Sequence, residues 1–435
     1  MKNHSHFASR WVWAASVLLA LTLTGCDFGQ NNSAASEDMQ SSFANDTTAK
    51  VTMWYPSGAE YNDALNDAIS RFQQTYPNVT FKIVKKAGLD IYQSYLIALN
   101  DDNSRPDLAI VDHVYIPNLA FEDQVANIGE LSAGDGVESN FPSTLYSANS
   151  YNGSAYGLPL SANTVVLMGN MDILNAAGIA TMPKTYSELL ADCQAIKEKT
   201  SYTPFAQPIN ETFCAMGFSS YVAREKGQMV SDDYKTVQLD SPNVKKAVND
   251  WVGLSKYASQ NEYEEGKFYG GGVGFIEMGS WNLAKVSQGE TSFKLGLSEM
   301  VTIDSETPNY SGLGLYSMVI AKKSAVKQAT YRFSKFLATD KTFQMAFAKV
   351  KALLPVTKDA LADDYYAKNQ YLSCFATQLT KVAPRPGTPV WSTLEQQIVN
   401  MLYGAVTASD SAGVDAAIES AQKKSQEATN RKFNG

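Results

Sequence analysis

The stretch VTMWYPSG at residues 51–58 opens the pattern that decides the fold. Its β-branched and aromatic residues predict a strand that ends at the Pro-Ser-Gly turn. Apolar side chains follow at helical spacing in residues 61–72, and VTFKI at residues 79–83 alternates as a second strand. Residues 91–99 are expected to form another helix, and DLAIVD at residues 107–112 is a short apolar strand. This alternation predicts an α/β fold whose parallel strands are joined by right-handed crossovers.

The rest of the chain continues the alternation. Residues 165–168, VVLM, begin a second series of elements. Thr185 and Glu188 have the spacing of a capping box, and Ser241 followed by Pro242 is typical of a helix start. Apolar spacing predicts further helices after residue 325, at 394–405 and at 414–421. A chain of 435 residues is too long for one small core, so two lobes are expected.

Composition argues against several functional classes. The net charge is −8 and only 18% of residues are charged, so the chain offers no phosphate-seeking surface and no nucleic-acid partner is expected. Two of the three histidines, His4 and His6, lie in the N-terminal leader. Only His113 would remain, in an expected loop, which excludes a multi-histidine metal site. No cofactor and no metal are therefore expected.

The cysteines show no metal-binding or redox spacing. Cys26 directly follows the leader, and an odd number of cysteines follows it, so that at most one disulfide can form. Cys193 lies on an apolar helical face and is expected to be a buried thiol. A pairing of Cys214 with Cys374 stays open.

The N-terminus resembles a bacterial lipoprotein signal. Lys2 and Arg10 accompany an apolar run at residues 11–23 that is short for a bilayer span. The sequence Leu23-Thr24-Gly25-Cys26 resembles a lipobox, which implies cleavage before Cys26 and lipid on its sulfur. A plain signal peptide with a chance cysteine is the alternative. With Asp27 resembling an inner-membrane retention pattern, the protein is expected on the outer face of the cytoplasmic membrane. The polar residues 26–48 would form a flexible tether.

Several short motifs in the body are each too common to indicate a family alone, but their combination and order are specific. They stand in this order: Arg105-Pro106-Asp107-Leu108 with Asp112, Tyr156-Gly157-Leu158-Pro159, Asn170-Met171-Asp172, Pro183-Lys184-Thr185-Tyr186, Met278-Gly279-Ser280-Trp281, Leu353-Leu354-Pro355-Val356, and Arg385-Pro386 with Trp391. From about residue 49 to the C-terminus, the chain resembles the extracellular solute-binding proteins of ABC-type carbohydrate importers, the maltose-type and glycerol-phosphate-type group.

The resemblance implies a two-lobed periplasmic-binding-protein-like fold in which each lobe has a mostly parallel sheet flanked by helices. Lobe one would be residues 49–160 plus 316–365, and lobe two would be residues 161–312 plus 366–435. A ligand would lie between the lobes, which would close around it by a hinge motion. The family also implies a monomer that delivers its ligand to ABC permease subunits.

Trp281 is the leading candidate for ligand contact. It follows Gly279 and Ser280, and is expected in the first turn of a helix capped by Ser280. A flat indole can cover the apolar face of a sugar ring at low entropic cost. The alternative is an indole packed in the core of lobe two.

Two carboxylates and one tyrosine are further candidates. Asp112 ends a strand and can accept hydrogen bonds from ligand hydroxyls, or it can cap the next helix. Glu60 lies where the first helix begins, and serves either the ligand or the helix dipole. Trp54 and Tyr55 point to opposite faces of a regular strand, and Tyr55 is expected on the cleft side.

The remaining candidates lie near the expected crossings between lobes. Asn163 can both donate and accept hydrogen bonds, although a turn role is equally open. Gly312 and Gly314 allow close backbone approach to a ligand, although the family more often has adjacent glycines here. Tyr316 serves either the ligand or strand packing. Arg385 can donate to hydroxyls or to an anion, or form a surface ion pair.

Three functions are weighed. The first is a carbohydrate-binding importer subunit that does no chemistry. The second keeps the fold but binds glycerol phosphate or its diesters, a ligand that Arg385 favours and Trp281 disfavours. The third is a surface glycoside hydrolase, which needs only two suitably spaced carboxylates but has no supporting motif.

Overall fold

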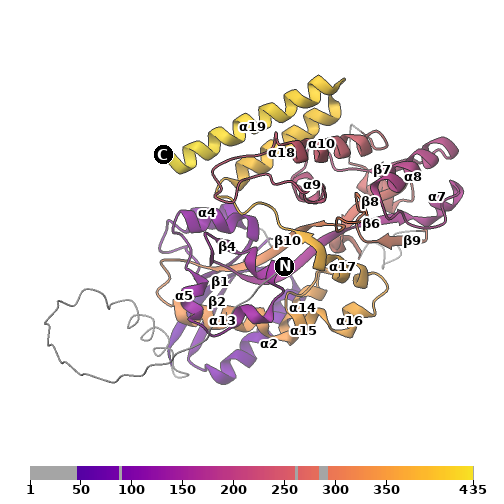
Figure 1. Cartoon of the computed structure of the whole chain (residues 1–435). Helices are drawn as coiled ribbons and strands as arrows, with labels where there is room; N and C mark the ends of the chain where they lie inside the picture. Colours follow the sequence, from indigo (N-terminus) through magenta and orange to yellow (C-terminus); the bar gives the residue numbers. More distant parts are fainter. Residues whose placement is uncertain (1–46, 88–90, 260–262, 284–291, 435) are drawn as a thin grey trace, which may run out of the picture.

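The computed structural model describes residues 47–87, 91–259, 263–283 and 292–434, and shows two lobes stacked along a shared central sheet (Figure 1). The leader, Cys26 and nearly all of the predicted tether lie outside the described residues. No helix in the described ranges is long and apolar enough to cross a bilayer.

One mixed sheet runs through both lobes in the order β2-β1-β3-β10-β6-β8-β7, with β9 beside β6 and β11 beside β10. Its strands are β1 (Ala49–Pro56), β2 (Val79–Lys86), β3 (Leu108–Asp112), β6 (Leu158–Asn170), β7 (Thr203–Ala206), β8 (Val273–Gly279), β9 (Leu295–Ser298), β10 (Ser311–Ile320) and β11 (Val382–Ala383). A separate hairpin joins β4 (Ser150–Tyr151) to β5 (Ser154–Ala155).

Strand direction separates the lobes from their connection. In lobe one, β1 pairs in parallel with β2 and β3, as the opening stretch of sequence predicts. In lobe two, β7 and β8 are parallel. Between them, β10 is antiparallel to both β3 and β6, and β6 is antiparallel to β8. The long strands β6 and β10 therefore cross from one lobe to the other.

Helices cover both lobes. Those of lobe one are α2 (Ala59–Thr75), α3 (Tyr92–Ala98), α4 (Ile116–Phe121), α5 (Ile128–Ser132), α6 (Ser143–Ser147), α13 (Lys327–Thr339), α14 (Lys341–Lys349), α15 (Lys358–Leu361) and α16 (Asp364–Ala367). Those of lobe two are α7 (Met171–Ala176), α8 (Tyr186–Lys199), α9 (Phe213–Arg224), α10 (Pro242–Ser255), α11 (Glu265–Tyr269), α18 (Trp391–Thr407) and α19 (Ser411–Asn434). The short 3₁₀ turns are η1 (His113–Tyr115), η2 (Val137–Asn140), η3 (Ser280–Asn282) and η4 (Leu379–Lys381), and α17 (Leu372–Gln378) lies beside the crossing strands (Figure 1).

Local sequence rules account for several of these elements. The capping box of α8 is formed, with Thr185 accepting from the backbone N–H of Glu188 and the Glu188 side chain accepting in return. Helix α10 begins at Pro242, although Ser241 makes no side-chain capping bond. Its predicted inward face is buried and includes Trp251, which packs edge-on against Tyr221.

The crossing strands are braced by hydroxyl groups. Thr164 Oγ1 donates to Ser311 Oγ over 2.9 Å, and Ser311 Oγ donates in turn to the carbonyl oxygen of Val165 over 2.7 Å. Further along the same pair of strands, the β6–β10 register shifts between Tyr316 and Ser317. The irregularity lies where the chain passes between lobes.

The cysteines behave as small buried residues. Cys193 and Cys214 are buried, Cys374 is half-buried, and all three are free thiols. The prediction for Cys193 is confirmed, and the pairing of Cys214 with Cys374 is absent from the structure. Burial raises the pKa of Cys214 to about 11, which leaves it protonated and unreactive near neutral pH.

Candidate functional site

A cleft lies where the two lobes and the crossing strands meet. Its deeper part has a volume of about 450 Å³ and is lined by Asp112, Tyr115, Asn163, Thr212, Phe213, Met216, Trp281, Gly314, Leu315, Tyr316, Arg385 and Glu395. A second hollow of about 330 Å³ is lined by Pro56, Ser57, Tyr61, Asn163, Trp281, Tyr316, Lys351 and Leu353. Because the two hollows share Asn163, Trp281 and Tyr316, they adjoin, and together they make up the cleft.

Trp281 lies at the junction of the two hollows. It is half-buried in η3, directly after β8, and its ring meets Phe213 edge-on at 5.8 Å between centroids. The ring folds back over Gly279, where an added Cβ would come within 1.8 Å of Cζ3. Gly279 is the capping residue rather than Ser280, so the expected cap is wrong. The position of Trp281 leaves part of the indole available to a ligand.

Asp112 and Arg385 bind each other at one end of the cleft. Arg385 Nη2 donates to both carboxylate oxygens of Asp112, over 2.8 and 2.7 Å. Asp112 also accepts from the backbone N–H of Val114 over 3.4 Å, so it caps η1 as the alternative interpretation held. Arg385 is only 7% exposed, which makes this a buried ion pair rather than a surface one. The two candidates are thus brought together as partners.

The charges around Asp112 fix its ionisation. Burial by itself would raise the pKa of Asp112, but the charge and hydrogen bonds of Arg385 together with the contacts of His113 outweigh that effect and hold the pKa well below its usual range. His113 Nδ1 lies 2.9 Å from Asp112 Oδ1. His113 is 2% exposed and lies in η1 rather than in a loop, so the expectation of a loop histidine is wrong. Burial lowers the pKa of His113, which keeps the imidazole neutral near pH 7.

Glu395 is a site residue that sequence reasoning missed. It lies one turn into α18 and is buried, with its Oε1 at 3.8 Å from Arg385 Nη1. The signal that could have found it is the spacing from Trp391, since one helical turn places residue 395 on the same face as residue 391. The deeper hollow therefore holds one guanidinium between two carboxylates.

Asn163 and Gly314 are neighbours on the crossing strands, paired in register across β6 and β10. Asn163 is buried, and its Oδ1 has no hydrogen-bond partner among the described residues. That atom would lie 1.9 Å from a Cβ at position 314. Glycine is therefore required here because the Asn163 side chain occupies the space. Tyr316, two residues further along β10, lines both hollows.

Three sequence candidates do not line the cleft. Gly312 packs against lobe two instead, since an added Cβ would lie 2.3 Å from the carbonyl oxygen of Met216. Tyr55 is 1% exposed and packs in the core against Phe347, because its strand face points inward. Glu60 is exposed at the start of α2, where it serves the helix N-terminus.

Tyr61 takes the place expected for Tyr55. Its ring packs edge-on against Tyr55, and it lines the second hollow with a buried hydroxyl that has no hydrogen-bond partner among the described residues. Burial and the nearby charge of Glu60 raise the pKa of Tyr61 to about 12, so the hydroxyl stays protonated. Helical spacing indicated only that Tyr61 faces inward.

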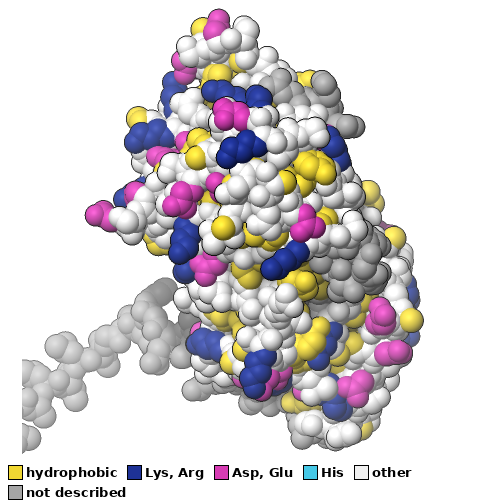
Figure 2. Space-filling model, turned by 90° about the vertical axis from the view of Figure 1, so that its right-hand side faces the viewer, with side chains coloured by type: hydrophobic (Ala, Val, Ile, Leu, Met, Phe, Trp, Pro, Cys, Tyr) yellow, Lys and Arg dark blue, Asp and Glu magenta, His cyan; other side chains and the backbone are white. Residues whose placement is uncertain are grey.

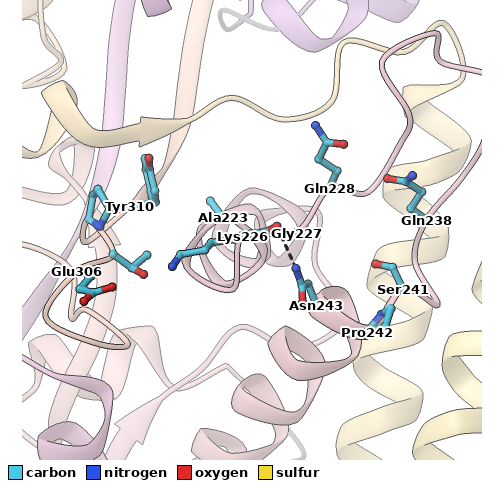
Figure 3. A pocket seen from close by; sticks show the side chains of 12 residues that line it. Ala223, Lys226, Gly227, Gln228, Gln238, Ser241, Pro242, Asn243, Glu306 and Tyr310 are labelled. Atoms are coloured by element: carbon cyan, nitrogen blue, oxygen red, sulfur yellow. Dashed lines mark hydrogen bonds between the residues drawn. The ribbon is translucent and has the colours of Figure 1, made fainter. Parts of the chain in front are cut away.

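A larger hollow lies within lobe two, away from the cleft. It has a volume of about 720 Å³ between the ends of α9 and α10 and the residues before β10 (Figure 3). Lys226, Gln228, Gln238 and Glu306 surround it, and Asn243 donates to the carbonyl oxygen of Lys226 over 3.1 Å. No cluster of metal-ligating side chains occurs in the described parts of the chain.

Comparison with known proteins places the chain in a family. Residues 67–372 match the family model described as bacterial extracellular solute-binding protein. The diacetylchitobiose-binding protein DasA of Streptomyces coelicolor is 24% identical over 393 residues, covering 88% of each chain. The maltotriose-binding protein of Pyrococcus abyssi is 24% identical over 374 residues, covering 82% of this chain and 78% of that protein.

Solved structures show the same fold. The cyclic α-maltosyl-1,6-maltose-binding protein of Arthrobacter globiformis superposes with a TM-score of 0.76 at 19% identity, covering 88% of this chain and 100% of that one. The sugar-binding protein MalE of Xanthomonas citri gives 0.77 at 19% identity, with 88% and 98% covered. The two-lobed α/β prediction is confirmed. With more than half of the sequence matching the family model, the chain belongs to the bacterial extracellular solute-binding proteins.

Proposed function

We propose that this protein captures a saccharide in the interlobe cleft and delivers it to the permease of an ABC importer. The observation that carries the proposal is the half-buried indole of Trp281, set between two hollows whose linings combine hydrogen-bonding side chains with a few apolar ones. A sugar presents apolar C–H faces and a rim of hydroxyls. Stacking on an indole and hydrogen bonding to the rim are the contacts this cleft can make.

Relatives support a carbohydrate as the ligand. DasA is named for diacetylchitobiose, and the Pyrococcus protein for maltotriose. Both names describe oligosaccharides, and a cleft of two connected hollows suits a ligand longer than one ring. We extend this ligand class to the present chain as part of the proposal.

Delivery needs the lobes to move. We propose hinge closure between lobe one, residues 49–160 plus 316–365, and lobe two, residues 161–312 plus 366–435, about the crossing strands. The register shift next to Ser317 supports this, since an irregular ladder bends more easily than a regular one. A monomer suffices, because each chain supplies both walls of its own cleft.

Two alternatives fit the site less well. A glycerol phosphodiester would bring negative charge to a hollow that already holds two carboxylates for one guanidinium. A hydrolase would need a carboxylic acid with a raised pKa, whereas Arg385 keeps the pKa of Asp112 low. Release of product from chromogenic glycosides would refute the non-enzymatic proposal.

We also propose lipid anchoring through Cys26, which the lipobox resemblance supports. Palmitate labelling of the native chain and of Cys26→Ser tests it. Label on the native protein alone is the expected result, and equal label on both variants contradicts the anchor.

The ligand is tested by intrinsic fluorescence and calorimetry with maltose, maltotriose, diacetylchitobiose, cellobiose and glycerol 3-phosphate. Saturable binding of at least one saccharide, accompanied by a change in tryptophan emission, is expected. Binding of glycerol 3-phosphate alone, or of none of these by a folded protein, contradicts the proposal.

A further inference from the structure

The guanidinium of Arg385 uses only part of its hydrogen-bonding capacity. Both bonds to Asp112 come from Nη2. Nε is buried without a partner among the described residues, and Nη1 lies 3.8 Å from Glu395 Oε1, beyond hydrogen-bond distance. A buried cation with unused N–H groups is costly unless another group supplies acceptors. The deeper hollow, into which Arg385 and Glu395 both face, is the place from which a ligand can do so.

We propose that Arg385 and Glu395 clamp one hydroxyl of the ligand, and that Glu395 is a specificity-determining residue. A hydroxyl oxygen set between them accepts from Nη1 and donates to Oε1. This inference rests on the proposed function and specifies its ligand class as a neutral saccharide with a hydroxyl at that position.

The clamp discriminates by the dual character of a hydroxyl. A phosphate or carboxylate accepts from Arg385 but has no proton for Glu395, and it would be repelled by both Glu395 and Asp112. An ammonium group donates to Glu395 but is repelled by Arg385. A deoxy sugar offers neither an acceptor to Arg385 Nη1 nor a proton to Glu395, which is the kind of mismatch that polar sites reject most strongly.

Asp112 acts as a positioning residue in this arrangement. Its two contacts with Nη2 anchor that end of the guanidinium, and its bond from the Val114 backbone helps to hold the carboxylate in place. Nη1 is thereby directed at Glu395 before any ligand arrives. Such preorganisation lowers the cost of binding, because the side chains need not be ordered by the ligand.

Calorimetry on the full chain tests the clamp, with whichever of maltotriose or diacetylchitobiose binds the native protein. Glu395→Gln is expected to weaken binding by about tenfold or more, the loss typical of a hydrogen bond to a charged group. Glu419→Gln, the same change at an exposed position on α19, is expected to stay within about twofold. A loss below about threefold in Glu395→Gln overturns the proposal.

A double-mutant cycle measures the coupling between Arg385 and Glu395 in ligand binding, which would be absent if Glu395 had only a structural role. Because one hydroxyl bridges both residues, Arg385→Lys and Glu395→Gln should weaken binding together by less than the product of their separate effects. Multiplicative effects overturn the shared clamp. Thermal melting checks that each variant is folded. If Arg385→Lys does not fold, Glu395→Asp replaces the cycle, because it moves the carboxylate back by one methylene group. Glu395→Asp should weaken binding by at least about fivefold, and unchanged binding overturns the clamp. If no saccharide binds the native chain, the proposed function fails first, so the two failures are distinguishable.

Discussion

The hollow within lobe two is larger than the deeper part of the cleft, at about 720 against 450 Å³, yet the two differ in what lines them. The larger hollow is built from lobe two and the residues leading into β10, and Lys226, Gln228 and Glu306 are exposed on its rim (Figure 3). The cleft draws residues from both lobes and from the crossing strands. It also holds a buried ion pair and Asn163 Oδ1, which has no hydrogen-bond partner in the part of the chain that the structure describes.

The difference teaches that volume alone does not identify a binding site. A hollow whose polar groups are solvated has nothing to gain from a ligand, whereas buried polar groups with spare capacity do. No side-chain polar atom lining the larger hollow is buried without a partner in the described ranges. Surface charge gives no further guide, since acidic and basic side chains are interspersed on the face seen in Figure 2.

The largest expected effect comes from breaking the buried ion pair of the cleft. Asp112→Asn leaves Arg385 with Glu395 at 3.8 Å as the nearest carboxylate, and should lower the free energy of unfolding by about 3 kcal/mol. Denaturant unfolding measures it. Asp102→Asn, which removes a partner of Arg105 at an exposed position, should cost under about 0.5 kcal/mol.

The difference in stability between the native chain and Asp112→Asn should depend on pH, because the pKa of Asp112 is lowered in the folded protein. A carboxyl whose folded pKa lies below its unfolded value stabilises the fold at pH above the unfolded value, about 3.9. That stabilisation is lost as the pH falls toward the folded pKa. The native chain should therefore exceed Asp112→Asn in stability at pH 7, with a gap that narrows below about pH 4. A gap that widens in acid contradicts this account.

The indole of the cleft should give the next largest effect. Trp281→Ala should weaken saccharide binding by about 30-fold, the loss of about 2 kcal/mol expected for a central aromatic contact. Calorimetry measures it. Tyr403→Ala, at an aromatic residue 45% exposed on α18, should leave affinity within about twofold. Equal losses in both variants would remove the distinction between cleft and surface.

Much of the fold, but less of the candidate site, could be predicted from the sequence. The strands near residues 51, 79 and 107 and the capping box of α8 depend on neighbours in the chain, and all were predicted. The pairing of Asp112 with Arg385 spans 273 residues, so no local pattern encodes it. Trp281 was found through a short motif. From the sequence, Glu395 and Tyr61 could be predicted only to lie in helices, because whether they face the cleft depends on how the lobes meet.

An effect of similar size is expected at the glycine that makes room for Asn163. Gly314→Ala places a methyl group 1.9 Å from Asn163 Oδ1, so either the side chain or the strand must shift. We expect a loss of about 2 kcal/mol in stability, together with weaker binding, since Asn163 lines both hollows. Gly266→Ala in α11, where an added Cβ meets nothing within 4 Å, should be neutral or slightly stabilising.

The smallest effect is the one that most directly separates the two regions. Lys226→Ala and Gln238→Ala alter the larger hollow at one exposed and one half-buried side chain away from the cleft, so saccharide affinity should stay within about twofold of the native value. Calorimetry measures the saccharide affinity of these variants, and the loss in Trp281→Ala serves as the reference for a large effect. A tenfold loss at Lys226 would mean that the larger hollow takes part in binding. Buried polar groups without hydrogen-bond partners among the described residues would then be the wrong criterion for identifying the binding site of this protein.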